Sequence, residues 1–254
     1  MSEAELVVPS FAKINWSLKV LGRREDGMHE VLTVFQTITL HDLLSFSTRR
    51  GARLTLTCNA PDIPVDESNL VLRAGRALQE KFNCKSGADI HLEKRIPAQG
   101  GLGGGSSNAA VALLALSRLW KINITKEELI EIGSSLGADV PFFFTGGTAL
   151  GKGLGTEVRA LEESPRLHLL IVAPESKVST ARAYKLLNAP ALTKGVGDAI
   201  FSISRGDANL ACSPPYGLDN DFERVVLGPH PEIERAKRAV LGAGALGALL
   251  AGSG

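Results

Sequence analysis

Apolar and polar residues alternate along the first part of the chain, as in strands that bury one face. From Ala12 to Val20 every second residue is apolar, and the residues between them, beginning with Lys13 and Asn15, are polar and share the opposite face. The same criteria predict further strands over residues 31–49 with a break near 41–42, 53–58, 87–96, 168–172, and along the apolar run that begins at Gly244. The N-terminal part of the chain is therefore expected to be rich in β-structure.

Helical periodicity and capping residues mark the segments between these strands. Asn69 is a plausible cap for a helix over residues 70–82, and Thr125 with Glu128 fits a capping box for a helix to about residue 135. Ser179 is expected to cap a helix that contains Tyr184. Further helices are predicted over residues 109–120, 197–204, 220–227 and 231–241.

Residues 97–110 (PAQGGLGGGSSNAA) join a predicted strand to a buried helix through a glycine-rich turn. Glycines allow consecutive backbone N–H groups to converge, and the first turn of a helix adds unpaired donors and a positive dipole end. Such a turn fits a phosphate. The hydroxyls of Ser106 and Ser107 could cap the helix, bind a phosphate oxygen or reach a magnesium ion. A flexible linker is the alternative, although linkers seldom lie between a strand and an apolar helix.

A few other residues are candidates for chemistry, each with a structural alternative. Asp139 lies among Val140, Pro141 and three phenylalanines, where a carboxylate is costly unless it is paired, so it is either a helix cap or a functional base. Lys13 on a strand face and His29 after a turn have ordinary surface roles as alternatives. Phe35 fits a protein core at least as well as a substrate pocket.

Composition narrows the class of protein. The chain has 254 residues, of which 44% are hydrophobic, and a formal net charge of +1. This near balance gives no electrostatic footprint for nucleic acid or an anionic membrane, so neither is expected as a partner. The three cysteines at positions 58, 84 and 212 suit reduced thiols. With no signal peptide and no apolar run of about 20 residues, a cytoplasmic location is expected.

The glycine turn is neither of two familiar nucleotide loops, because no lysine follows it as in a P-loop and no acidic residue follows about 20 residues later as in a Rossmann unit. It resembles instead the second motif, P-x-x-x-G-L-x-S-S-x-A, of the GHMP kinases, a family of small-molecule ATP kinases. AKINWSLKVLGRREDGMHE resembles the first motif of one branch of that family, and GADVPFF resembles its catalytic segment. The branch usually has tyrosine where this chain has Met28.

The resemblance implies an α+β fold, with an ATP-binding domain similar to ribosomal protein S5 domain 2 over residues 1–162 and a smaller C-terminal domain over 163–254. It implies phosphorylation, from ATP with Mg²⁺, of the C2 hydroxyl of a methylerythritol linked to cytidine diphosphate, a step of the non-mevalonate route to isoprenoids. The alternatives are another GHMP kinase, of homoserine or mevalonate type, or a non-catalytic ligand sensor. Either a monomer or a homodimer is compatible with the sequence.

The resemblance also assigns roles to residues, with the metal ligands left open. Lys13 and Asp139 are the expected catalytic pair. The expected nucleotide contacts are Asn69, Pro97, Gly100, Gly101, Leu102, Gly103, Gly104, Gly105, Ser106 and Ser107. The expected substrate contacts are Asn15, Met28, His29, Phe35 and Tyr184, with His29 hydrogen-bonded to cytosine and Tyr184 stacked on it. The terminal Gly-Ser-Gly resembles the start of the third family motif, which continues into another strand in relatives, so truncation at Gly254 is expected.

Overall fold

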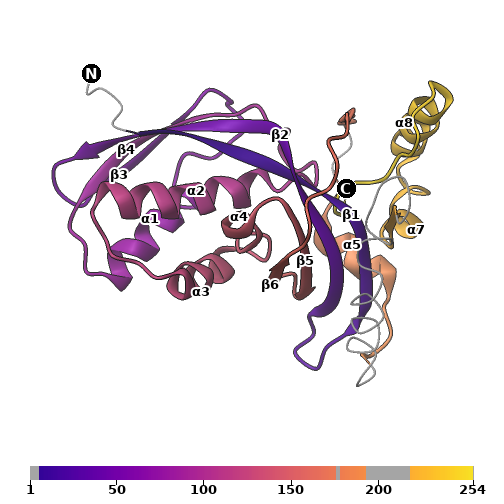
Figure 1. The fold of residues 1–254 in the computed structure, drawn as a ribbon, viewed down its shortest axis with the longest axis horizontal. Coiled ribbons are helices and arrows are strands. Elements are labelled where there is room, and N and C mark those ends of the chain that lie inside the picture. The colour runs from indigo at the N-terminus through magenta and orange to yellow at the C-terminus, as the bar shows by residue number, and fades with distance from the viewer. Residues whose placement is uncertain (1–5, 176–177, 193–217, 254) are drawn as a thin grey trace. The chain divides into compact units, whose positions relative to one another are not determined.

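The computed structural model describes residues 6–175, 178–192 and 218–253 (Figure 1). Its strands are β1 (Leu6–Arg23), β2 (His29–Arg49), β3 (Leu54–Cys58), β4 (Gly87–Glu93), β5 (Thr148–Gly153), β6 (Glu157–Ala160) and β7 (Asp219–Asn220). Its helices are α1 (Leu70–Lys81), α2 (Gly104–Leu119), α3 (Lys126–Leu136), α4 (Phe142–Thr145), α5 (Thr180–Leu187), α7 (Glu223–Val226) and α8 (Pro231–Gly242). Mixed helices and strands agree with the expected α+β class. No helix in the described ranges is long and apolar enough to cross a membrane.

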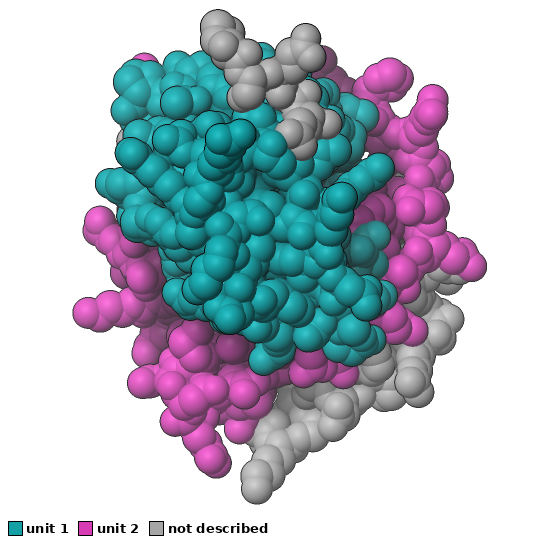
Figure 2. Space-filling model, turned by 90° about the vertical axis from the view of Figure 1, so that its left-hand side faces the viewer, with its two compact units in different colours: residues 1–13, 37–98, 103–145 teal, residues 14–36, 99–102, 146–254 magenta. Residues whose placement is uncertain are grey.

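The chain forms two compact units, coloured separately in Figure 2. The first contains residues 1–13, 37–98 and 103–145, and the second contains residues 14–36, 99–102 and 146–254. Strands β1 and β2 each contribute residues to both units. The sequence-based division at residue 162 stays a prediction, whereas these units interleave segments that are far apart in the sequence.

The first unit packs two helices against one face of a sheet. Strand β4 pairs with β2 in antiparallel register, from Leu43 opposite Glu93 to Arg49 opposite Gly87, and pairs with β3 in parallel. Helices α1 and α2 lie side by side against these strands (Figure 1). Apolar residues of α2 such as Leu113 and Leu116 are fully buried in the same cluster as Phe46 of β2. Burial therefore fixes α2, and with it the glycine turn at its N-terminus.

The second unit is built around the N-terminal part of β2 and the C-terminal half of β1. Strand β5 pairs antiparallel with β2, and β6 pairs with β5. Strand β7 lies parallel to β1, with Leu18 opposite Asn220. Leu18 also belongs to a small apolar cluster with Ala183 of α5 and Phe222 at the start of α7. This cluster attaches α5 to the strands.

Most of the expected elements are present, including the Asn69 cap, the Thr125 capping box and the Ser179 cap. The break predicted at residues 41–42 is wrong, because β2 continues through them. The helix predicted over 220–227 begins instead with β7 and contains only the short α7. The helix predicted over 197–204 and Cys212 lie outside the described residues. Cys58 and Cys84 are free thiols.

Two of the predicted strands are absent from the described residues. Residues 168–172 have no strand partner, and the side chain of Leu170 is 76% exposed. The run from Gly244 is likewise not a strand. A short apolar run satisfies the strand pattern, but a strand also needs a neighbour that supplies hydrogen bonds.

Candidate functional site

The glycine turn presents the uncapped N-terminus of α2. Helix α2 begins at Gly104, and its N-cap, Gly103, has a left-handed backbone with φ 68° and no side-chain cap. The first intrahelical bond runs from the N–H of Ser107 to the carbonyl of Gly103. The N–H groups before Ser107 therefore have no partner in the helix and are available to an anion.

Lys13 and Asp139 meet beside this turn. Lys13 Nζ lies 3.2 Å from Asp139 Oδ2, and the side chain of Lys13 is 4% exposed while that of Asp139 is 33% exposed. Within the described residues no helix N–H donates to Asp139, so the ion pair, not a helix cap, holds this carboxylate. The shaft of Lys13 packs against Gly103, where a Cβ would lie 2.9 Å from Lys13 Cγ. The predicted catalytic pair and the phosphate turn are thus brought together.

The two serines of the turn have different surroundings. Ser107 is buried, and its Oγ lies 2.7 Å from Ser10 Oγ, which also donates to Asn108 Oδ1. Ser107 therefore ties α2 to β1. Ser106 is only half-buried, and its Oγ faces Gly137 in the segment that leads to Asp139. Of the two hydroxyls, that of Ser106 is the better placed for a ligand.

The remaining glycine contacts join the turn to the end of the described chain. Gly101 has φ 68°, and a Cβ there would collide with the carbonyl of Ala251. A Cβ at Gly252 would in turn lie 3.2 Å from Gly101 Cα. The Gly-Ser-Gly segment therefore packs directly on residue 101, next to which Gly100 is half-buried and Leu102 is buried.

Asn69 uses its side chain within the protein. Its Oδ1 accepts a hydrogen bond from the N–H of Val71, and its Nδ2 donates to the carbonyl of Pro64. The next residue, Leu70, lies against Gly105 in the first turn of α2. The start of α1 is thus adjacent to the glycine turn, although Asn69 itself acts as a cap. Pro97, at the beginning of the turn, is half-buried.

Two of the predicted substrate residues, His29 and Tyr184, form an aromatic corner with Phe222 in the second unit. The rings of His29 and Tyr184 are stacked with centroids 4.7 Å apart, and Tyr184 meets Phe222 edge-on at 4.8 Å. Two rings at 4.7 Å are in direct contact, so a cytosine does not fit between them as they stand. Met28, beside His29, is 53% exposed.

Burial lowers the pKa of His29 below its ordinary value of 6.5, and the positive charge of Arg23 lowers it further. The imidazole is therefore neutral at physiological pH and offers one donor and one acceptor. This is the protonation state in which a histidine can pair with a base that itself carries both donors and acceptors.

Asn15 and Phe35, by contrast, are packed into the second unit. Asn15 Nδ2 donates to Thr33 Oγ1 at 2.7 Å. Phe35 is buried against Gly151, where a Cβ would lie 2.5 Å from the ring. The structure gives both residues internal partners, and their contact with substrate stays a prediction.

Two residues that the sequence reasoning missed hold the C-terminal glycine segment. Asn220 Nδ2 donates to the carbonyls of Leu250 and Gly252, at 2.8 and 2.6 Å. Glu223 Oε1 accepts a hydrogen bond from the N–H of Leu250. The local sequence pattern predicts a helix for Asn220 and Glu223 and does not indicate their contacts with residues about 30 positions later. The burial of Asn220, which would point to such a contact, is known only from the structure.

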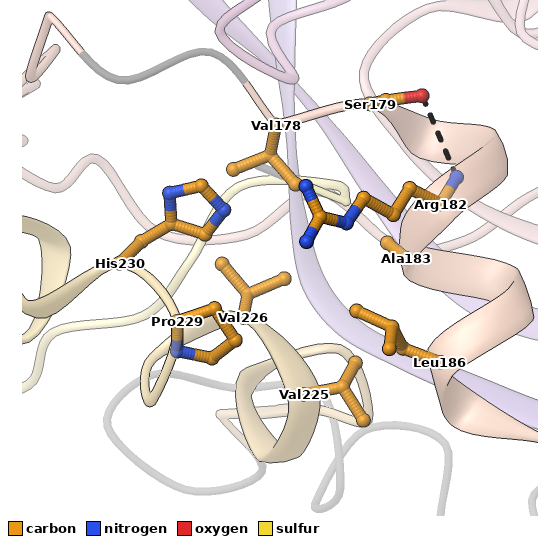
Figure 3. Close-up of a pocket in the computed structure, with 9 residues that line it drawn as sticks. All are labelled: Val178, Ser179, Arg182, Ala183, Leu186, Val225, Val226, Pro229 and His230. Atoms are coloured by element: carbon orange, nitrogen blue, oxygen red, sulfur yellow. Dashed lines mark hydrogen bonds between the residues drawn. The ribbon is translucent and has the colours of Figure 1, made fainter.

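A pocket lies among α5, α7 and α8 in the same unit (Figure 3). Its lining is mostly apolar, and Arg182 and His230 are the two residues of the lining with basic side chains. None of the predicted site residues lines it. This pocket is therefore not part of the candidate site.

Comparison with known proteins gives consistent results. Residues 69–147 match the model of the GHMP kinases N terminal domain. A protein of Pelotomaculum thermopropionicum named 4-diphosphocytidyl-2-C-methyl-D-erythritol kinase is 42% identical over 248 residues, which are 96% of this chain and 84% of that protein. One of the same name from Caldicellulosiruptor saccharolyticus is 36% identical over 98% of this chain and 86% of its own length.

Solved structures are similar as well. A crystal structure of 4-(cytidine 5'-diphospho)-2C-methyl-D-erythritol kinase is 32% identical, with a TM-score of 0.75 over 98% of this chain and 87% of that one. Methanococcus jannaschii mevalonate kinase has a TM-score of 0.64 over 100% of this chain and 89% of that one, at only 13% identity. This second similarity shows a shared fold alone.

Proposed function

Since the chain belongs to the GHMP kinase family and, within it, to the 4-diphosphocytidyl-2-C-methyl-D-erythritol kinases, we propose that it phosphorylates the C2 hydroxyl of 4-diphosphocytidyl-2-C-methyl-D-erythritol with ATP. It is thus an ATP-dependent kinase that acts in isoprenoid biosynthesis. The observation that carries the proposal is the ion pair of Lys13 and Asp139 beside the open N-terminus of α2.

Phosphoryl transfer depends mainly on positioning and on stabilisation of charge, which these residues can supply. The unpaired N–H groups of the first turn of α2 would hold phosphate oxygens of ATP. Asp139 would orient the acceptor hydroxyl and take its proton, and the ammonium of Lys13 would favour negative charge on the attacking oxygen. Asp139 is the more exposed of the pair, as expected for the group that meets the substrate.

Magnesium is compatible with this arrangement. The described ranges contain no cluster of three or more His, Cys, Asp or Glu side chains. Mg²⁺ commonly uses only one or two protein carboxylates together with phosphates and waters. The Ser106 hydroxyl, phosphate oxygens of ATP and water would hold the ion, which would neutralise charge on the transferred phosphoryl group.

One assay tests the proposal. ADP release is measured with ATP and each of 4-diphosphocytidyl-2-C-methyl-D-erythritol, homoserine and mevalonate, and we expect turnover with the first alone. Preference for another alcohol would assign the chain to a different GHMP activity. Binding of ATP and substrate without ADP release would instead identify a ligand sensor.

We place the cytosine on the exposed side of the His29 and Tyr184 rings. Tyr184→Ala should then weaken binding of the cytidyl substrate by about 1–3 kcal/mol, which is typical of base stacking on an aromatic ring. Tyr184→Phe, which keeps the ring and its edge-on contact with Phe222, serves as the matched control and should bind nearly as the wild type does. Calorimetry that shows equal losses for ATP and the cytidyl substrate would assign Tyr184 to general packing.

The lowered pKa of His29 predicts how substrate affinity responds to pH. Protonation removes the acceptor of the imidazole, so KM for the cytidyl substrate should be constant near neutral pH and rise once the pH falls through a pKa below 6.5. KM for ATP should not follow. His29→Gln should remove this acid limb. An apparent pKa above 6.5, or the same limb in the variant, would show that another group controls binding.

We also propose a cytoplasmic enzyme that functions as a monomer or homodimer without nucleic-acid or membrane partners. The absence of nucleic-acid and membrane partners follows from the near balance of 28 basic and 27 acidic residues. Light scattering at several protein concentrations measures the oligomeric state.

A further inference from the structure

Asp42 is a fully buried carboxylate that the proposed mechanism does not use. It lies on β2, is 0% exposed, and accepts three hydrogen bonds, all from consecutive residues. Its Oδ2 lies 2.6 Å from Lys94 Nζ, and its Oδ1 accepts from the N–H groups of Arg95 and Ile96 at 2.7 and 2.8 Å. A buried carboxylate that accepts from these three donors is rigidly held.

The position of Asp42 at the end of a ladder explains these bonds. The antiparallel pairing of β2 with β4 ends with Leu43 opposite Glu93. Beyond that pair the chain leaves the sheet toward the glycine turn, and its N–H groups have no strand to donate to. Asp42, the residue before Leu43 in β2, accepts hydrogen bonds from two of these N–H groups with its side chain. The Asp42 carboxylate thus takes the place of a strand partner for the first residues between β4 and the glycine turn.

Two of the three residues held by Asp42 contact the start of α2. A Cβ built on Gly104 would lie 3.1 Å from Ile96 Cγ2 and 3.1 Å from Lys94 Nζ. Gly104 is the first residue of the helix whose N-terminus faces the phosphates in the proposed function. A shift of residues 94–96 would therefore displace the helix terminus or the turn before it.

We propose that Asp42 is a positioning residue for ATP, which sets the phosphate turn through Lys94 and Ile96 without touching the nucleotide. The inference rests on the proposed function, because it assigns ATP phosphates to the N-terminus of α2. Removing the carboxylate should loosen nucleotide binding specifically, since the aromatic corner at His29 belongs to the other compact unit.

The test compares Asp42→Ala with Asp42→Asn, whose amide oxygen can still accept the two backbone hydrogen bonds. We expect Asp42→Ala to raise KM for ATP at least about tenfold, since small displacements of positioning groups have effects of this size or larger. Asp42→Asn should restore most of the affinity. KM for the cytidyl substrate should change little in both. Asp89→Asn is the control, since Asp89 lies on the paired strand β4 and binds Arg49 and Thr55 away from the turn.

Thermal unfolding separates positioning from folding. If the Asp42 variants only lower the unfolding midpoint, with KM for ATP unchanged well below that temperature, the inference is wrong. It is equally wrong if both substrates lose affinity to the same extent, or if Asp42→Asn behaves like Asp42→Ala. If Asp42→Ala does not fold, Asp42→Ser takes its place, because the serine hydroxyl cannot reach both N–H groups. The proposal is then supported if Asp42→Ser raises KM for ATP while Asp42→Asn keeps the wild-type value, and it is wrong if the two variants have the same KM for ATP. Wild-type enzyme without kinase activity would refute the proposed function instead.

Discussion

Asp139→Asn should lower kcat at least about a hundredfold, while KM for ATP stays nearly unchanged. The substitution keeps the shape of the side chain and removes the charge that pairs with Lys13 at 3.2 Å. Loss of a general base commonly reduces turnover by two to four orders of magnitude, and the N–H groups of α2 remain in place to bind ATP. Steady-state kinetics over both substrates measures this effect.

Lys13→Met provides the matched comparison, because it removes the other half of the pair and keeps the packing of the shaft on Gly103. If the two residues act as a unit, the double variant should be little slower than the slower single variant. Turnover of Asp139→Asn near the wild-type value would remove Asp139 from the catalytic step altogether.

Gly103→Ala should lower kcat/KM for ATP by about one to two orders of magnitude. The backbone of Gly103 has φ 68°, which disfavours any side chain, and the new Cβ would lie 2.9 Å from both Lys13 Cγ and Phe143 Cζ. To relieve these contacts Lys13 has to move, and its ammonium then leaves Asp139. Misplacement of a reacting group by about 1 Å is enough for a loss of this size.

Gly51→Ala is the control for backbone strain. Gly51 has φ 76° and nothing within 4 Å of a built Cβ, so it tests the left-handed conformation without a collision. Both substitutions should reduce stability by roughly 1–2 kcal/mol, and only Gly103→Ala should impair kinetics. Equal kinetics in the two variants would show that Gly103 does not position Lys13.

Elements that depend on neighbouring residues could be predicted from the sequence. The capping box at Thr125 and the glycine turn before α2 each depend on a few consecutive residues, and both are present. Asp42 shows where this reasoning fails. A polar pair within an alternating run indicates a break, but the donors that stabilise Asp42 inside β2 come from residues more than 50 positions away.

In the candidate site, too, contacts between residues far apart in the sequence could not be predicted. Lys13 and Asp139 were assigned to the catalytic pair only through the resemblance to a family. Their 3.2 Å separation depends on the tertiary fold, which the sequence pattern does not describe. His29 and Tyr184 were both expected at the substrate, but their direct stacking, which excludes a base from between them, could not be foreseen from two residues 155 positions apart. Asn220 was not identified, because its partners lie in the last residues of the described chain.

The interleaving of the two compact units limits how this protein can be divided or rebuilt. Each unit is assembled from three separate stretches of chain, and the boundary along β1 falls between Lys13 and Ile14. No single cut yields either unit as a continuous fragment, so a split-protein reporter or a domain swap made at one junction would transfer parts of both. A circular permutation with new termini at Gly51, where a built Cβ meets nothing within 4 Å, keeps both β1 and β2 intact and is the better route to a rearranged enzyme.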